Sequence, residues 1–471
     1  MGFTEIIFFF LFLPVSIIVY LLVDRFISSG KAKNIVLILL SLGFYYWASK
    51  QSLVLFLSIV VFSYLAGLAI GNEKKEKKKL GFAVCGLVGA LLFFKYAAFV
   101  TRWINQIVEK DIIRLGSFVV PIGISFVVFE AVSYVVDIYR GDAPAGSFLD
   151  CLTFFSLFPK LVSGPIVLWK DFQGQIHNRK SSLEKTSLGL ERIIIGYAKK
   201  VIIADTLGLQ ISLISNGLAS GGADWPSMWL KALLYFFQIY YDFSGYSDIA
   251  IGLAEVFGFS FKENFSHPYL SQSISEFWRR WHISLGTWFR EYVYIPLGGN
   301  RKGNVYLNLF VVFLLTGIWH GSGWTFLIWG GFHGICVVFE RRMREKEWYK
   351  KTPAFFKWVV TMFVVFLTWI LFMSSGLPDA QKNFMGLFQS LATEHMTFTW
   401  RYYLSSRTII LLVISMLYEL SGLEFVQKKL QMFETHKMVI IGKKVFLIVL
   451  LVIDMLFVIN STYHPFIYFQ F

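Results

Sequence analysis

Charged residues are scarce in this sequence, and their scarcity excludes an ordinary soluble globular protein. Only 16% of the 471 residues are Asp, Glu, Lys or Arg, whereas soluble domains contain about 25%. Hydrophobic residues make up 56% of the chain. A soluble fold of this composition would expose a large apolar surface to water, so the sequence predicts an integral membrane protein.

Several signatures of enzymes and binding proteins are also missing. The sequence has no Gly-rich phosphate loop with Lys, no zinc-protease helix motif and no Ser nucleophile elbow. Cys85, Cys151 and Cys336 are too far apart for a disulfide framework or a zinc site, so we expect no metal. These absences argue against a primary pump and a standard hydrolase.

Apolar runs near the length of a membrane crossing, about 20 residues, occur along most of the chain. The middle, 148–300, differs: its runs are short and broken by polar residues, so we expect a funnel or pocket there rather than simple crossings. We predict one membrane-embedded domain, 1–471, with N-terminal helices in 1–140, a motif-bearing core in 148–340 and C-terminal helices in 355–471. The predicted crossings are 6–22, 34–48, 52–70, 80–98, 117–138, 304–319, 324–340, 355–375, 407–420 and 445–460.

The net charge of +14 comes mainly from short linkers between apolar runs, not from a basic face on a soluble domain. It therefore does not indicate nucleic-acid binding. Cationic linkers remain on the cytoplasmic side of a membrane. Placing 74–79, 341–351 and 428–444 there predicts a multi-pass membrane protein with both termini outside.

His320 is the strongest catalytic candidate. It ends the apolar run 311–319 and precedes Gly321-Ser322-Gly323, where we expect a sharp turn whose glycines allow close backbone approach and positive φ angles. Imidazole titrates near neutrality and suits general-base chemistry on a hydroxyl. The alternative is a structural histidine that caps the helix. For His333, between glycines, we expect a hydrogen bond to a neighbouring helix.

A second focus is 277–290, where aromatic residues recur at helical spacing and predict one amphipathic helix at the membrane interface. His282 is in line with Gly286, which leaves space beside the imidazole. An incidental histidine on an anchoring helix is an equal alternative. Arg279, Arg280 and Arg290 could attract anionic lipid or a cofactor's phosphates.

Asp242 and Asp248 lie in an otherwise apolar stretch. Each carboxylate costs about 2.5–3.5 kcal/mol on membrane-insertion scales, so both need partners. They either contact substrate or pair with the arginines of 279–290. The aromatic ending 463–471, which includes Tyr468, either lies at the interface or inserts into a pocket.

Four motifs have a characteristic order: Asp242-Phe-Ser-Gly-Tyr-Ser-Asp248, Phe277-Trp-Arg-Arg-Trp-His-Ile-Ser-Leu285, Tyr294-Ile-Pro-Leu-Gly-Gly-Asn-Arg301 and Trp319-His-Gly-Ser-Gly-Trp324. Together they resemble the membrane-bound O-acyltransferase family, in its bacterial alginate O-acetyltransferase-like branch. The resemblance implies an all-α fold, a ring of tilted transmembrane helices around a funnel with a thin floor. His320 matches the family's principal catalytic histidine, and His282 matches its second histidine.

The resemblance also implies a cytoplasmic thioester donor, most simply acetyl-CoA, and an extracytoplasmic polysaccharide acceptor served through a partner acetyltransferase. We expect Asp242, Asp248, Arg280, Trp281 and Trp319 to bind substrate. Tyr468 is a candidate for a transient acyl acceptor. Two alternatives stay open: D-alanyl transfer from a carrier protein to a cell-wall polymer, and a non-enzymatic transporter that uses the buried carboxylates.

Overall fold

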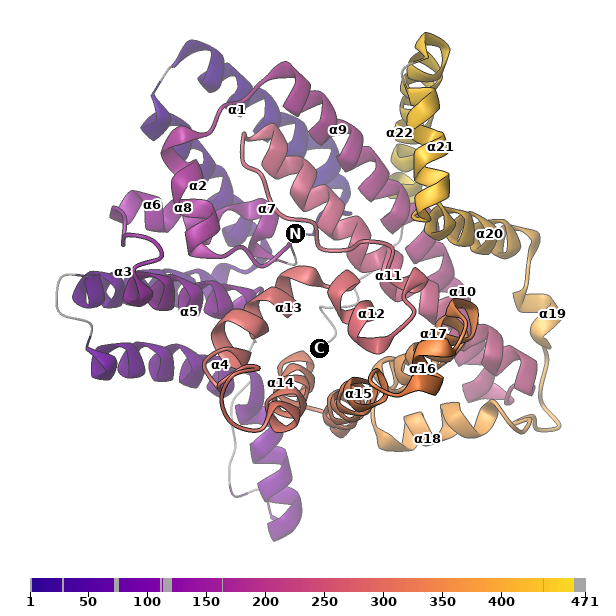
Figure 1. The fold of residues 1–471 in the computed structure, drawn as a ribbon. Helices are drawn as coiled ribbons and strands as arrows, with labels where there is room; N and C mark the ends of the chain where they lie inside the picture. Colours follow the sequence, from indigo (N-terminus) through magenta and orange to yellow (C-terminus); the bar gives the residue numbers. More distant parts are fainter. Residues whose placement is uncertain are drawn as a thin grey trace. The chain divides into compact units, whose positions relative to one another are not determined.

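The computed structural model describes residues 2–27, 29–71, 76–110, 112, 121–162, 164–434 and 436–460, and every regular element in these ranges is a helix (Figure 1). Within them, five helices are long and apolar enough to cross a membrane, or six if one bent pair forms a single span. The prediction of an all-α, multi-pass membrane protein is confirmed. The ring, the funnel and its thin floor stay predictions.

The chain divides into two compact units, and the single-domain expectation stays a prediction. One unit comprises Met1–Ile193 and Ile249–Lys262, and the other comprises Ile194–Asp248 and Glu263–Phe471. His282, Trp319 and His320 all belong to the second unit.

The first unit is built around α5 (Ile124–Arg140), whose side chains are almost all buried. Glu130 of α5 forms an ion pair with Lys160 of α7 (Phe158–Leu161), and both side chains are at most 3% exposed. A buried ion pair of this kind fixes one helix against the other. The other helices that begin in this unit are η1 (Phe8–Phe12), α1 (Leu13–Phe26), α2 (Gly30–Ala48), η2 (Lys50–Ser52), α3 (Leu53–Gly71), α4 (Lys77–Val108), α6 (Phe148–Ser156), α8 (Trp169–Asn178) and α9 (Leu183–Tyr197).

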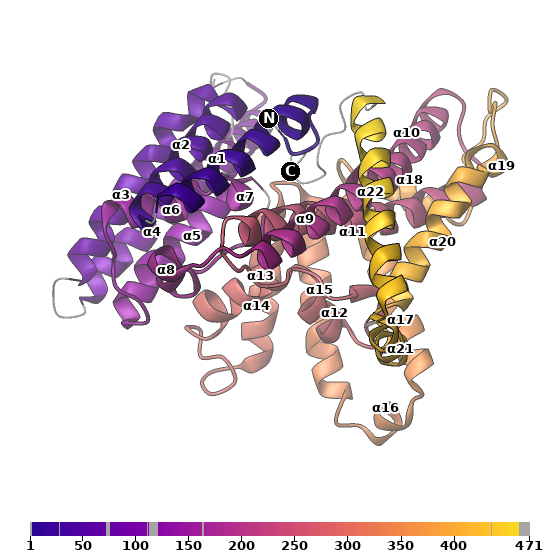
Figure 2. The ribbon, with the colours of Figure 1, turned by 90° about the horizontal axis from the view of Figure 1, so that it is seen from above.

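The second unit contains a tight hairpin of α14 (Val305–His320) and α15 (Trp324–Met343). The short helix α16 (Glu347–Lys351) lies in the link from α15 to α17 (Ala354–Met373), as Figure 2 shows. Its other helices are η3 (Ala198–Ala204), α10 (Asp205–Ser220), α11 (Trp225–Val256, which continues into the first unit), η4 (Pro268–Leu270), α12 (Ile274–Arg280), α13 (Ile283–Phe289), η5 (Arg290–Tyr294), α18 (Leu377–Gly386), α19 (Trp400–Tyr403), α20 (Ser406–Leu420), α21 (Glu424–Glu434) and α22 (Lys437–Asn460).

Two helices in the middle of the chain are longer than the sequence suggests. Residues Leu183–Ser220 form one candidate span of 38 residues, and α11 continues through Asp242 and Gly245 for 32 residues. The expectation of short, broken segments is wrong here. The charges do not interrupt the helices because they are paired across the helix contact, as described below.

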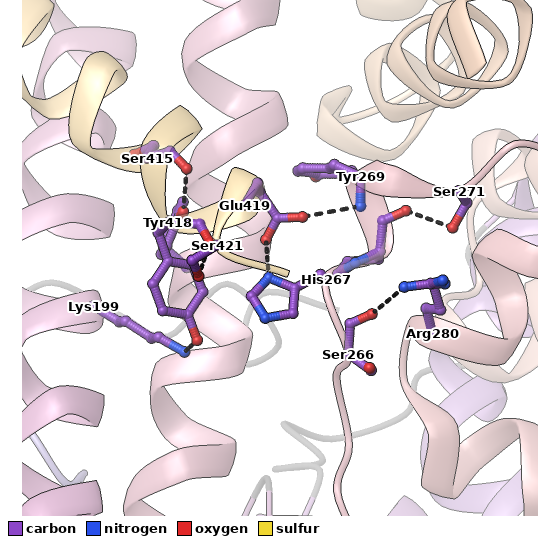
Figure 3. Close-up of polar contacts among 12 residues, drawn as sticks. Lys199, Ser266, His267, Tyr269, Ser271, Arg280, Ser415, Tyr418, Glu419 and Ser421 are labelled. Atoms are coloured by element: carbon purple, nitrogen blue, oxygen red, sulfur yellow. Dashed lines mark hydrogen bonds and ion pairs between the residues drawn. The ribbon is translucent and has the colours of Figure 1, made fainter. Parts of the chain in front are cut away.

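A sharp bend of 89° separates α20 from α21. The bend is closely packed: a Cβ added to Gly422 would lie 2.2 Å from the ring of His267. Glu419 accepts a hydrogen bond from the Tyr269 backbone at 3.2 Å and lies 3.8 Å from His267 Nδ1 (Figure 3). Packing and polar contacts therefore hold this bend in place.

Candidate active site

The α14–α15 hairpin places His320 at a helix end. The two helices approach closely because Gly317 and Gly330 face each other: a Cβ on Gly317 would lie 2.4 Å from the Phe326 carbonyl oxygen, and one on Gly330 would lie 2.5 Å from that of Phe313. Small residues allow such close helix crossings in membranes. As a result, His320 is only 4% exposed although it is the last residue of α14.

The glycines of the turn provide the predicted close packing but not the predicted positive φ. Gly321 has a φ of −163° and Gly323 a φ of −83°, so neither adopts the left-handed conformation. A Cβ at Gly321 would instead lie 2.2 Å from the ring of Phe326. The expectation of positive φ is wrong, and close packing explains the glycine at 321.

Aromatic rings surround the His320 imidazole. The centroids of Trp319, Trp329 and Phe372 lie 4.7, 5.2 and 5.2 Å from that of the imidazole. Such packing restricts the orientation of the imidazole ring.

His282 lies between two short helices rather than inside one. The predicted continuous helix over 277–290 is wrong, because α12 ends at Arg280 and α13 begins at Ile283. His282 has a φ of 45°. A left-handed backbone is uncommon outside glycine and often marks a functional position. Backbone hydrogen bonds from Ser266 to Arg280 and from Ile283 to Asn264 hold the break.

Asn264 fixes the tautomer of His282. Its side-chain oxygen accepts from the Ser284 backbone at 3.2 Å and from Ser284 Oγ at 2.9 Å, which identifies that atom as the carbonyl oxygen. Because it lies 3.1 Å from His282 Nδ1 and can only accept, Nδ1 must carry the proton. His282 Nε2 consequently presents its lone pair.

Burial keeps this imidazole neutral. His282 is 1% exposed, and burial lowers its pKa to about 3 because the cation would lose its hydration. Phe243 packs edge-on against the ring at 4.6 Å. His282 is therefore an uncharged imidazole of fixed tautomer at neutral pH.

The Trp319 ring lies near both histidines. Its ring centroid is 6.2 Å from that of His282 and 4.7 Å from that of His320. The structure thus brings together three of the residues predicted for the site.

A cavity of about 570 Å³ reaches His282. Its lining includes four arginines, of which Arg279 and Arg290 come from the α12–η5 segment and Arg341 and Arg344 from the end of α15. The space that a side chain at Gly286 would take is open, since an added Cβ would meet only the Trp278 carbonyl oxygen at 3.6 Å. The apolar part of the wall comes from α12 and α13 and from α14 and α15, which contribute Leu309, Val312, Phe313 and Val337.

His333 supports the wall of this cavity. The indole N–H of Trp278 donates to His333 Nδ1 at 3.3 Å, and His333 Nε2 lies 3.0 Å from the Thr368 hydroxyl. That hydroxyl donates to the Val365 carbonyl at 2.9 Å, so it accepts from Nε2–H. The predicted hydrogen bond between helices is confirmed, and its effect is to hold Trp278 in the cavity wall.

The predicted carboxylates pair with lysines rather than with the arginines of 279–290. Asp242 lies 2.6 Å from Lys200 Nζ, and Asp248 lies 2.7 Å from Lys199 Nζ. Lys199 also donates to the Tyr418 hydroxyl at 2.6 Å (Figure 3). The two lysines belong to the π-helix η3, so these aspartates stabilise the contact between η3 and α11.

The other predicted binding residues lie apart from the cavity lining or outside the described residues. Trp281 is buried among aromatic rings, and its ring centroid lies 4.9 Å from that of Trp369. Arg280 forms an ion pair with Glu276 at 2.9 Å. Tyr468 lies outside the described residues. Among the described residues, no three His, Cys, Asp or Glu side chains gather in a way that could hold a metal ion.

A neutral imidazole in the lining of a cationic cavity, with one indole ring near both it and a second buried imidazole, suits transfer of a group carried on an anionic donor. A sequence model of the membrane-bound O-acyltransferase family matches residues 46–378, which include both histidines. The chain belongs to the membrane-bound O-acyltransferase family. It is an O-acyltransferase embedded in a membrane by several helices.

Curated relatives of this O-acyltransferase act on different polymers. It is 40% identical to a probable alginate O-acetylase of Pseudomonas putida over 82% of this chain and 80% of the relative. It is 33% identical to a peptidoglycan O-acetyltransferase of Helicobacter pylori over 82% of this chain and 79% of the relative. Its similarity to a teichoic acid D-alanyltransferase of Streptococcus thermophilus is weaker: the two are 29% identical over 51% of this chain and 61% of the relative.

Proposed function

We propose that this O-acyltransferase moves an acetyl group from cytoplasmic acetyl-CoA toward hydroxyls of an extracytoplasmic polysaccharide, with His320 as the general base. The observation that carries this proposal is the arginine-lined cavity whose lining includes His282, with the Trp319 ring near both His282 and His320. The higher identity to the O-acetylases supports acetyl over D-alanyl transfer.

The cavity suits a nucleotide thioester donor. Arginine guanidinium groups bind phosphates through bidentate, charge-assisted hydrogen bonds. The apolar wall from α14 and α15 would contact the flexible arm that carries the thioester. Residues 341–351 are basic, and the positive-inside rule directs such residues to the cytoplasm. Because Arg341 and Arg344 line the cavity, the cavity would open to the cytoplasm.

The reaction exchanges one acyl bond for another. His320 removes the proton from the acceptor hydroxyl while its oxygen attacks the thioester carbonyl; the C–O bond forms and the C–S bond breaks. The proton then passes from His320 to the departing thiolate, so the protein ends unchanged. General-base catalysis of this kind contributes about 10²–10⁴-fold to the rate.

His282 would orient the donor. Its Nδ1 is committed to Asn264, so only Nε2 can face the donor, where its lone pair can accept a hydrogen bond from an amide of the donor arm. An unprotonated Nε2 cannot donate to an oxyanion. The geometry therefore favours orientation of the thioester over stabilisation of developing negative charge.

The acetyl group would reach the polymer through an extracytoplasmic partner acetyltransferase. We include Tyr468 in this proposal as a transient acceptor, since the charge pattern puts the C-terminus on the outer side. Tyr468→Phe keeps the aromatic ring and removes the nucleophile. Loss of polymer acetylation in that variant, with donor hydrolysis retained, supports the relay; unchanged acetylation rejects it.

The central test uses purified protein and acetyl-CoA labelled in the acetyl group. Wild-type protein should hydrolyse or transfer the label, and His320→Ala should lose this activity while remaining inserted and folded. A wild-type rate in His320→Ala would refute the general base. A transporter would show no turnover of the label in either protein, and a D-alanyl transferase would turn over only a D-alanyl thioester.

A further inference from the structure

A second, smaller pocket lies between three helices of the second unit. It has a volume of about 320 Å³ and is formed by η3 and α10, the start of α20 and the end of α22. None of its residues belongs to the cavity that reaches His282. Its lining consists of Val201, Asp205, Thr206, Leu209, Arg407, Leu456, Phe457 and Asn460.

The pocket combines a cation with an incompletely paired acid. Asp205 is 7% exposed; its Oδ1 accepts from Lys200, whereas its Oδ2 has no hydrogen-bond partner within the described part of the chain. A buried carboxylate oxygen is costly to leave without a donor. A ligand with an N–H donor would satisfy it.

Arg407 is available for an anion. One guanidinium N–H donates to Thr206 Oγ1 at 3.1 Å, and the group lies 5.2 Å from the centroid of Phe457. A guanidinium has five N–H donors, so several remain for a phosphate. The exposed Asn460 amide adds another polar group at the rim.

The remainder of the rim is apolar and faces outward. Leu209 is 45% exposed on the candidate span Leu183–Ser220, and Leu456 is 54% exposed on the apolar helix α22. Arg407 lies in the first turn of α20 and Asn460 ends α22, while the lysines of 428–444 belong to α21 and to the first turns of α22. By the positive-inside rule the pocket is on the outer half of the membrane.

We propose that this pocket binds the headgroup of an ethanolamine phospholipid from the outer leaflet. The phosphate pairs with Arg407, the primary ammonium donates to Asp205, and the acyl chains lie along Leu209 and Leu456. Basic pockets between transmembrane helices bind lipid headgroups in this way. The acidic partner favours a headgroup that carries both charges over a purely anionic one.

Lipid binding to the purified, delipidated protein tests this proposal. Native mass spectrometry would compare phosphatidylethanolamine, phosphatidylglycerol and phosphatidylcholine with identical chains. The wild type should bind phosphatidylethanolamine most tightly, since glycerol lacks an ammonium and the choline nitrogen has no N–H. Arg407→Gln should weaken binding at least tenfold, and Asp205→Asn should abolish the preference for ethanolamine.

Two controls keep the result specific. Arg401→Gln removes an exposed arginine of neighbouring α19 that stacks on Trp400, and it should bind as the wild type does. Thr206→Val tests the site with a smaller change if Arg407→Gln unfolds, and it should also weaken binding. Soluble glycerophosphoethanolamine should not displace the lipid at equal concentration, because it lacks the chains.

The proposal is overturned by any of three results. These are equal binding of phosphatidylglycerol and phosphatidylethanolamine by the wild type, wild-type binding in folded Arg407→Gln and Thr206→Val, or displacement by the soluble headgroup.

Discussion

At the scale of single residues, the site depends on a side chain that carries no sequence signal of its own. Asn264 lies 18 positions before His282, in a segment without helix or motif. It accepts from His282 Nδ1 and from Ser284, and its amide donates to Ser247 Oγ at 3.0 Å. One asparagine thereby sets both the tautomer and the orientation of the imidazole.

Removing this contact should reduce turnover more than donor binding. In Asn264→Ala, His282 loses its acceptor, and we expect kcat to fall roughly fivefold, because a hydrogen bond is worth about 1 kcal/mol and 1.36 kcal/mol corresponds to a tenfold rate. Steady-state kinetics with acetyl-CoA measures the effect. An unchanged kcat in a folded variant contradicts the positioning role.

Asn264→Asp should change the pH dependence. Burial lowers the pKa of His282, so its neutral form persists as the pH falls well below 6. An added carboxylate stabilises the imidazolium and raises that pKa. Activity should then decline on acidification at a higher pH than in the wild type. Asn178→Asp, an exposed change of the same chemistry, should leave the profile where it is.

At the scale of helices, glycine and paired charges explain the Asp242–Asp248 motif. A Cβ at Gly245 would lie 2.7 Å from the Gly196 carbonyl oxygen and 3.1 Å from the Lys200 nitrogen. Only a glycine therefore lets α11 lie close enough for both aspartates to reach the lysines of η3.

Gly245→Leu should separate these helices. Overpacking costs about 1–3 kcal/mol, and the displaced lysines would lose their partners as well. We expect a lower midpoint of thermal unfolding in detergent and weaker activity. Gly89→Ala in α4 is a matched control, since an added Cβ there meets nothing within 4 Å. Equal stability of the two variants would argue against the close contact.

The Glu130–Lys160 pair offers a second test of buried charge. Removing one partner leaves an uncompensated buried charge and costs about 3–5 kcal/mol, whereas replacing both with apolar residues is often neutral. Lys160→Met should therefore destabilise the protein more than the double variant Glu130→Leu/Lys160→Met. Thermal unfolding of both, compared with the wild type, decides whether the second substitution restores stability.

At the scale of the whole molecule, composition was sufficient to predict a membrane protein, and the motifs were sufficient to predict its family. The sequence could also place His320 at a turn between two helices. It could not reveal the break at His282, because aromatic residues keep the same spacing whether or not the helix continues. The φ of 45° there depends on tertiary contacts with Asn264.

The ion-pair partners of Asp242 and Asp248 could not be predicted from the sequence, for a related reason. Periodicity indicates which face of a helix is buried, but not which helix lies opposite. The lysines at 199 and 200 looked like interruptions of a span, whereas they are the counter-charges that make the span possible.

The predicted orientation of the chain can be tested by cysteine labelling. On a Cys85→Ser background, which removes the exposed native thiol, Glu394→Cys should react with a membrane-impermeant maleimide in intact cells. Lys346→Cys, in the cationic linker after α15, should react only after permeabilisation, because positive linkers remain inside. The opposite pattern would invert the orientation, and with it the side from which the donor enters.

The position of Trp319 near both imidazoles has a consequence for the cell as well as for catalysis. If the two histidines are reached from opposite sides, as proposed, one indole is part of the seal that separates the cytoplasm from the exterior. Trp319→Ala would then let protons and small ions leak, and a voltage-sensitive dye should report a collapsed membrane potential on expression. Trp319→Phe should largely preserve the seal, so a bulky ring at this position would maintain the energy supply of the cell.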